Sequence, residues 1–191
     1  MAEQMISSGD DKGYAVISAG LKTYPLYFYL QYQWLSKHLD QEKQILHFLN
    51  KSHKSLYARK LRRKWLNHLY KQGKWDSFVA NYRSSSSQLM QCRYHWAEYQ
   101  RNYKTKALTA TQKIWLTGHS LPKDCDPLLN KFTQSSFLTQ KLIWQRFILA
   151  AKARQYSLAT YLSKKLNSAT AVKAADKWLK LTSVFPYQLR R

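Results

Sequence analysis

Apolar residues recur every three or four positions along most of this chain, which is the spacing of one face of an α-helix. Leu26, Leu30 and Trp34 form one such stripe. No segment alternates apolar and polar residues over the length of a strand between turn signals. The pattern therefore predicts an all-α protein.

The stretch from Cys92 to Cys125 contains both cysteines and predicts a pair of helices joined by a short turn. Two apolar runs each fall on one helical face, the first made of Leu89, Cys92, Trp96, Tyr99 and Tyr103, and the second of Ala107, Ala110, Ile114 and Trp115. A disulfide between the two cysteines would hold the pair together, whereas two buried free thiols are expected in a cytosolic protein. The residues alone leave both alternatives open.

Capping and turn signals divide the rest of the chain into roughly ten helices with short connections. Pro25 is expected in the first turn of one helix, Asp40 at the N-cap of the next, and Gly73 at the end of a long one. The final residues, FPYQLRR, are typical of a truncation at Arg191 or of the start of another element.

Helices in consecutive antiparallel pairs predict an α-superhelix, or solenoid, in which each pair buries its aromatic face against the next. A compact orthogonal helical bundle is the alternative. We expect residues 1–13 to form a disordered or added tail, because they are polar, and residues 14–191 to form a single domain.

Composition narrows the class of protein further. The chain has 191 residues, of which 45% are hydrophobic, so it can build a real core. Its 5 Gly and 4 Pro are too few for the many tight turns of an all-β domain. No apolar run is long enough to span a membrane. The first residues lack the apolar segment of a signal peptide, as in a cytoplasmic protein or a trimmed secreted one.

The formal net charge of +22 favours an anionic partner, such as nucleic acid, anionic lipid or an acidic polymer. The strongest candidate for an anion-binding face lies in the predicted helix that ends near Gln72, and consists of Arg59, Arg62, Arg63, Lys64 and Lys71. Tyr57, Trp65 and Tyr70 could stack on nucleic-acid bases there. They share a helical face with Leu61 and Leu69, however. This placement favours the alternative in which the aromatic residues belong to the core and the basic residues form a solvated face.

The sequence predicts no catalytic residue, no metal site and no cofactor. No His–Cys group has zinc-ligand spacing, and the nucleotide-binding and nucleophile-elbow motifs are absent. His95 is interpreted as a structural helix residue. Glu98, near Trp96 and Arg101, is expected to pair with a neighbouring base rather than to act as a general acid.

Two islands of sequence resemble the N-terminal part of the large, soluble lytic transglycosylases of bacterial cell walls. Tyr24-Pro25-Leu26-Tyr27, with Tyr29-Leu30 and Tyr32, is similar to that family's YPLYPYLEY segment. The second island runs from Cys92 through Trp115-Leu116-Thr117-Gly118 to Ser120, Pro122, Cys125 and Asp126. The order and separation of the two islands agree with those of the family's segments, so the resemblance covers roughly residues 14–181.

The resemblance implies a U-shaped α-superhelical domain of a periplasmic enzyme that cleaves the MurNAc–GlcNAc bond to 1,6-anhydro products. It also implies a bridge between Cys92 and Cys125. The family's catalytic domain, with its Glu-Ser motif, is absent, so the chain alone is expected to be inactive. Its expected partners are peptidoglycan, the catalytic part of its own parent protein, or other cell-wall proteins. A cytoplasmic nucleic-acid-binding protein and a protein-interaction solenoid are the alternatives.

Overall fold

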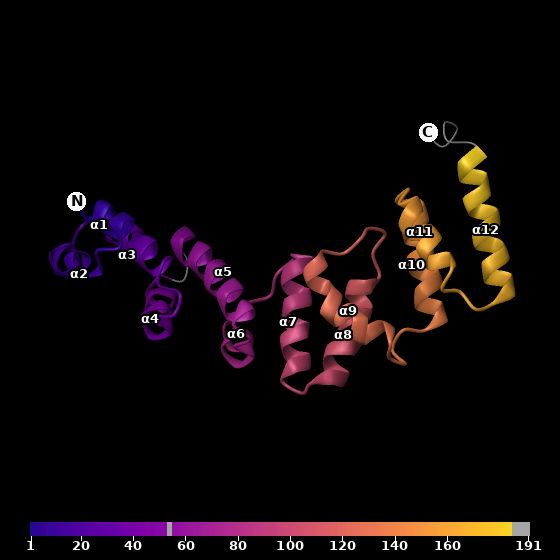
Figure 1. Ribbon diagram of the computed structural model, residues 1–191, viewed down its shortest axis with the longest axis horizontal. Coiled ribbons are helices and arrows are strands. Elements are labelled where there is room, and N and C mark those ends of the chain that lie inside the picture. The colour runs from indigo at the N-terminus through magenta and orange to yellow at the C-terminus, as the bar shows by residue number, and fades with distance from the viewer. Residues whose placement is uncertain (53–54, 185–191) are drawn as a thin grey trace. The chain divides into compact units, whose positions relative to one another are not determined.

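The computed structural model describes residues 1–52 and 55–184. Every regular element in that part of the chain is a helix, twelve of them α-helices and one a short 3-10 helix (Figure 1). The predicted all-α fold of consecutive helix pairs is confirmed. The predicted element at FPYQLRR lies outside the described residues. None of the described helices is both long and apolar enough to cross a bilayer.

Chain contacts cluster into two compact units, Met1–Asn81 and Tyr82–Arg191. The first unit consists of α1 (Ala2–Ser8), α2 (Asp11–Gly20), α3 (Tyr27–Leu35), α4 (Glu42–Lys51), α5 (Leu56–Lys71) and α6 (Trp75–Asn81). The predicted periodicity of α5 is confirmed, since Leu61, Trp65 and Leu69 are all buried. Gly73 follows the helix with φ +67°, a conformation that suits glycine at a helix end.

The first residues of the chain form a docked helix where a disordered tail was expected. Ile6 of α1 is buried in a cluster with Tyr14 and Leu30. The Lys37 ammonium donates to the carbonyl oxygens of Ile6, at 2.7 Å, and Ser7, at 3.1 Å. A cation at the C-terminal end of a helix satisfies carbonyls that lack partners within the helix. The single domain expected over residues 14–191 stays a prediction.

Two helix starts differ from those expected. Pro25 lies in the turn before α3, because the helical hydrogen bonds begin with Leu30 N–H donating to the Leu26 carbonyl. Asp40 does not cap α4: the N-cap is Gln41, and the Asp40 carboxylate accepts from the Gln41 side-chain amide at 3.1 Å. The Asp40 prediction was therefore wrong, since that side chain bonds its neighbour instead of a backbone N–H of the helix.

The second unit consists of α7 (Gln88–Gln100), α8 (Lys104–Trp115), the 3-10 helix η1 (Lys123–Cys125), α9 (Asp126–Thr133), α10 (Gln140–Lys152), α11 (Tyr156–Ser163) and α12 (Ala169–Val184). Its helices pack in consecutive pairs, most closely α7 with α8 and α10 with α11 (Figure 1). One core cluster runs through five of them, and Trp115, Phe132 and Phe147 are its largest members.

Candidate functional site

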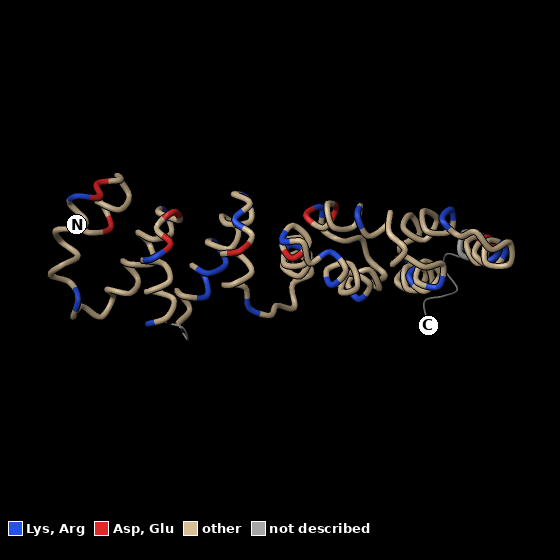
Figure 2. The backbone as a smooth tube through the Cα atoms, turned by 90° about the horizontal axis from the view of Figure 1, so that it is seen from below, with Lys and Arg blue, Asp and Glu red and all other residues tan. Residues whose placement is uncertain are grey.

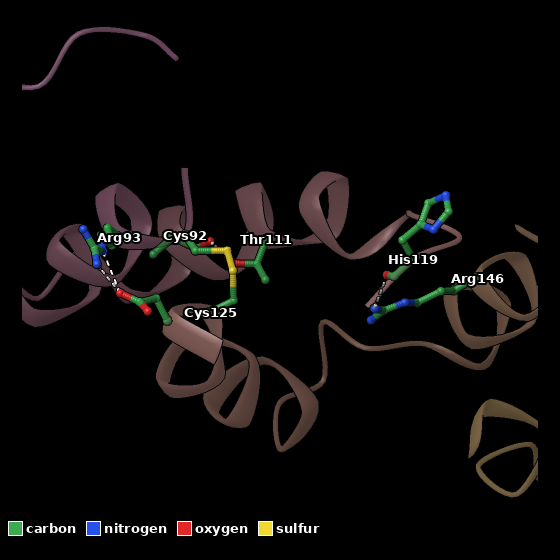
Figure 3. The surroundings of a disulfide bond; sticks show 8 residues. Cys92, Arg93, Thr111, His119, Cys125 and Arg146 are labelled. Atoms are coloured by element: carbon green, nitrogen blue, oxygen red, sulfur yellow. Dashed lines mark hydrogen bonds and ion pairs between the residues drawn. A yellow bond between two sulfur atoms is a disulfide. The ribbon is translucent and has the colours of Figure 1, made fainter. Parts of the chain in front are cut away.

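A disulfide joins Cys92 on α7 to Cys125 at the end of η1, as the resemblance implied (Figure 3). The S–S distance is 2.07 Å, and neither residue has any exposed surface. Ile114 of α8 completes a small buried cluster with the two cysteines. A cross-link over a separation of 33 residues contributes about 3–4 kcal/mol in the chain-entropy account.

An ion pair lies directly beside this disulfide. Arg93 follows Cys92 on α7, and its Nε donates to Oδ2 of Asp124 at 2.8 Å; Asp124 precedes Cys125 in η1 (Figure 3). The residue next to Cys92 and the residue next to Cys125 thus bind each other as well. The disulfide and the ion pair together fix η1 against α7.

The WLTG segment, residues 115–118, begins with the last residue of α8 and makes structural contacts with α10. The Trp115 side chain is buried, and the guanidinium carbon of Arg146 lies 4.0 Å from its ring centre. A Cβ on Gly118 would lie 2.5 Å from the backbone oxygen of Leu149, so the loop approaches the backbone of α10 too closely for any side chain at this position. The tryptophan and glycine of the motif therefore have a packing role.

Arg146 is a buried residue that the sequence analysis did not identify. Only 4% of it is exposed, and Nη2 donates to the His119 carbonyl oxygen at 3.3 Å (Figure 3). Burial lowers the pKa of its guanidinium to about 10. Arg146 lies in the middle of an otherwise amphipathic helix. Nothing in the sequence pattern of that helix indicates that the guanidinium is removed from water.

Glu98 is the buried acid of the second unit, and it is paired with bases, as expected. Its carboxylate accepts from Lys106 Nζ at 2.7 Å and from His95 Nδ1 at 2.8 Å. Burial by itself raises the pKa of the carboxyl, but the hydrogen bonds from Lys106 and His95 outweigh that effect and lower the pKa below its ordinary value. A carboxylate held ionised in this way is suited to orienting its two partners and unsuited to donating a proton.

The two bases face an open groove of about 580 Å³ between α7 and α8. His95, Lys106 and Lys113 give it a basic rim, and Ala110 and Ile114 an apolar floor. The groove can accommodate an anionic group. It contains no acid among its lining residues, and no cluster of three metal-ligating side chains occurs within the described parts of the chain.

The five residues of the predicted anion-binding face of α5 differ in their exposure to solvent. Arg59, Arg63, Lys64 and Lys71 are exposed, and the Lys64 ammonium lies 5.8 Å from the centre of the Tyr32 ring. Arg62 is half-buried instead, and its Nη1 donates to the Asn81 carbonyl oxygen at 3.2 Å. Four of the five predicted residues therefore remain at the surface.

The aromatic residues of that helix point into the unit. Trp65 is completely buried, Tyr57 packs against Tyr29 and Tyr32, and Tyr70 packs against Trp75. The rings of Tyr57 and Tyr70 are already in contact with other aromatic rings. The basic face of α5 thus lacks the stacking platform of a single-stranded nucleic-acid site.

Sequence comparison matches 150 residues, 77% of this chain, to the soluble lytic murein transglycosylase of Escherichia coli K12 at 28% identity. The corresponding protein of Salmonella typhimurium is 29% identical over the same length. Both matches cover 23% of the relative, so the chain spans about a quarter of the length of these proteins.

Structure comparison gives the same family. The 70-kDa soluble lytic transglycosylase of Escherichia coli matches with a TM-score of 0.77 and 25% identity, over 95% of this chain and 30% of that one. The same figures apply to a complex of the 70-kDa enzyme with bulgecin A. An inactive mutant of the lytic transglycosylase Slt from Pseudomonas aeruginosa matches all of this chain and 32% of that one, with a TM-score of 0.75 and 27% identity.

A profile of the cucumovirus coat protein family matches residues 98–185, which is less than half of the chain. The similarity to transglycosylases is more extensive in sequence and in structure, and includes both cysteine-bearing segments of the second unit. The homologues of this chain are therefore the soluble lytic murein transglycosylases, to one part of which it corresponds.

Proposed function

We propose that this chain is a non-catalytic helical scaffold and binding domain of a peptidoglycan lytic transglycosylase. The observation that carries the proposal is the match to solved transglycosylases over 95% of this chain but only 30% of theirs. The WLTG motif supports it, because Trp115 and Gly118 serve packing against α10 rather than chemistry. The parent protein would cleave the glycan strand of murein with a domain that lies elsewhere in its sequence.

The periplasm is the compartment that we propose. The Cys92–Cys125 disulfide supports it, because structural disulfides persist in oxidising compartments and are rare in the cytosol. Protein isolated from its natural compartment and then denatured should therefore resist thiol alkylation until it is reduced. Alkylation of both cysteines without reductant would contradict the periplasmic assignment.

The excess of basic residues supports peptidoglycan as the partner. Lys and Arg occur along both units, with the densest run at residues 59–64 of α5 (Figure 2). A distributed positive charge attracts a polyanionic mesh such as murein, whose peptides carry free carboxylates. The rest of the parent protein is a second proposed partner. Nucleic acid fits less well, since the aromatic rings of α5 are occupied by packing.

The test is an assay for turnover and binding on purified murein sacculi. We expect the chain to sediment with sacculi, to be released by added salt, and to produce no anhydro-muropeptides. A full-length lytic transglycosylase in a parallel reaction verifies that the substrate is competent. Release of anhydro-muropeptides by this chain would disprove the non-catalytic role, and failure to sediment would disprove the binding role.

A further inference from the structure

A pocket of about 320 Å³ lies within the first unit, between α2, α3 and α4. Its apolar part consists mainly of aromatic rings, from Tyr14 on α2, Tyr27 and Trp34 on α3, and Phe48 on α4. Its volume falls at the lower end of the range for small-molecule sites. An aromatic pocket of this size suits one ring-shaped ligand.

The aromatic part of the pocket is held in place by contacts around Trp34. The indole N–H donates to Oδ1 of Asp11 at 2.9 Å, and the ring stacks on Tyr14 with a centroid distance of 5.8 Å. His38 stacks on Trp34 at 4.1 Å and binds Oδ2 of the same aspartate at 3.0 Å. A site that is already ordered before binding loses less conformational entropy when a ligand enters.

The polar part of the pocket indicates the chemistry of the ligand. Gln31 supplies an amide from α3, and Gln44 and His47 supply an amide and an imidazole from α4. Amides both donate and accept, which suits hydroxyl and acetamido groups. Lys43 also lines the pocket, and no carboxylate does. An aromatic site without an acid but with an ammonium group disfavours cationic ligands and favours a neutral or acidic one.

We propose that this pocket binds one acidic N-acetylated sugar residue of a glycan strand whose peptide has been removed, so that its carboxylate is free, with N-acetylmuramic acid as the representative ligand. The apolar face of the pyranose ring would lie on the aromatic part, and the amides would bind its hydroxyl and acetamido groups. Lys43 would bind its carboxylate. This inference rests on the proposed function, because it assigns the glycan-binding part of the same role to a site in the first unit.

The test uses the complete chain and follows the Trp34 indole N–H in ¹H–¹⁵N spectra during titration with single sugars. N-acetylmuramic acid should shift that signal saturably, with a Kd of about 1 mM. N-acetylglucosamine, which has the same ring and acetamido group but no carboxylate, should bind about tenfold more weakly, because it lacks the charge-assisted bond to Lys43. Cationic glucosamine should cause no saturable shift.

Matched substitutions distinguish the contribution of the Lys43 charge to sugar binding from that of the aromatic contact. Lys43→Ala should abolish the preference for the acidic sugar, whereas Lys60→Ala on α5, which does not line the pocket, should keep it. Tyr27→Ala should weaken binding of both sugars, and Tyr24→Ala should leave it unchanged. Circular dichroism of each variant verifies the fold. Equal binding of the two sugars, or a preference that survives Lys43→Ala, would overturn the proposal.

Sedimentation with sacculi separates this inference from the function on which it rests. If the unsubstituted chain sediments but no single sugar shifts Trp34, the pocket proposal is wrong and the scaffold proposal stands. If the chain neither sediments nor responds to sugars, both are wrong. If sugars bind as expected and the chain does not sediment, the pocket is a sugar site and the proposed binding of intact murein is wrong.

Discussion

The guanidinium carbon of Arg146 lies 4.0 Å from the ring centre of Trp115, and both side chains are buried. The contact joins α10 to the end of α8, immediately before the loop that leads back to the disulfide. Burial lowers the pKa of Arg146 to about 10, so the group is still charged at neutral pH. A desolvated cation over an aromatic face gains about 2 kcal/mol or more from that contact.

Arg146→Lys should lower the free energy of unfolding by about 1–2 kcal/mol, because an ammonium group is more strongly hydrated and cannot stack as a planar guanidinium does. Arg146→Met fills a similar volume without a charge and should stay within about 1 kcal/mol of the unsubstituted chain. Urea unfolding at neutral pH measures both. A lysine variant as stable as the original chain would show that the stacked geometry contributes nothing.

Gly118→Ala should destabilise the chain by about 1–3 kcal/mol, the usual cost of forcing extra atoms into a packed region. The added methyl would lie 2.5 Å from the Leu149 backbone oxygen, so α10 or the loop must move. Gly20→Ala is the control, because a Cβ there meets nothing within 4 Å. It should be neutral or slightly stabilising. Equal melting temperatures for the two variants would contradict the close approach.

Removal of the disulfide should cost about 3–4 kcal/mol of stability, since it releases a cross-link over 33 residues in the unfolded chain. The double substitution Cys92→Ala with Cys125→Ala tests this without leaving a lone thiol. Thermal unfolding with and without reductant gives a second measure on the original chain. Addition of reductant should lower the melting temperature of the original chain and leave that of the double variant unchanged.

The helices could be predicted from the sequence because their signals are local. Leu61, Trp65 and Leu69 are spaced for one helical face, and they are buried as that spacing predicts. Gly73 marks a helix end because its φ of +67° is accessible to glycine at little cost. Asp40 shows the limit of such signals, since a residue suited to capping can bond a neighbouring side chain instead.

Contacts between distant residues could not be predicted in the same way. The docking of α1 depends on Lys37, which reaches the Ile6 carbonyl from 31 positions away, and no pattern within residues 1–13 reveals that partner. Arg62 belongs to a basic run, yet it donates to Asn81 within the unit. Cys92 and Cys125 were paired by resemblance to a family. Their residue types alone left both the bridge and two free thiols open, with the bridge only slightly favoured.

Glu98→Gln should lower the free energy of unfolding at neutral pH by about 1–2 kcal/mol, because it weakens two charge-assisted hydrogen bonds of a buried group. The glutamine keeps the shape of the side chain, but it replaces one accepting oxygen with a donating amide. Lys106 Nζ and His95 Nδ1 both donate to Glu98 in the original chain, so in the variant either one contact is lost or His95 changes tautomer to accept from the new amide.

The effect of Glu98 should depend on pH with a defined sign. Its pKa in the folded chain lies below the ordinary value of 4.5, so the unfolded chain takes up the proton first as the pH falls. The carboxylate therefore stabilises the fold fully above about pH 4.5, and this contribution is lost as the pH falls through the lower folded-state pKa. The stability difference between the original chain and Glu98→Gln should be largest near neutral pH and shrink steadily in acid. Glu3→Gln removes an exposed carboxylate and supplies the baseline. If the stability difference between the original chain and Glu98→Gln stayed constant down to pH 3, the Glu98 carboxylate would not be held ionised by Lys106 and His95.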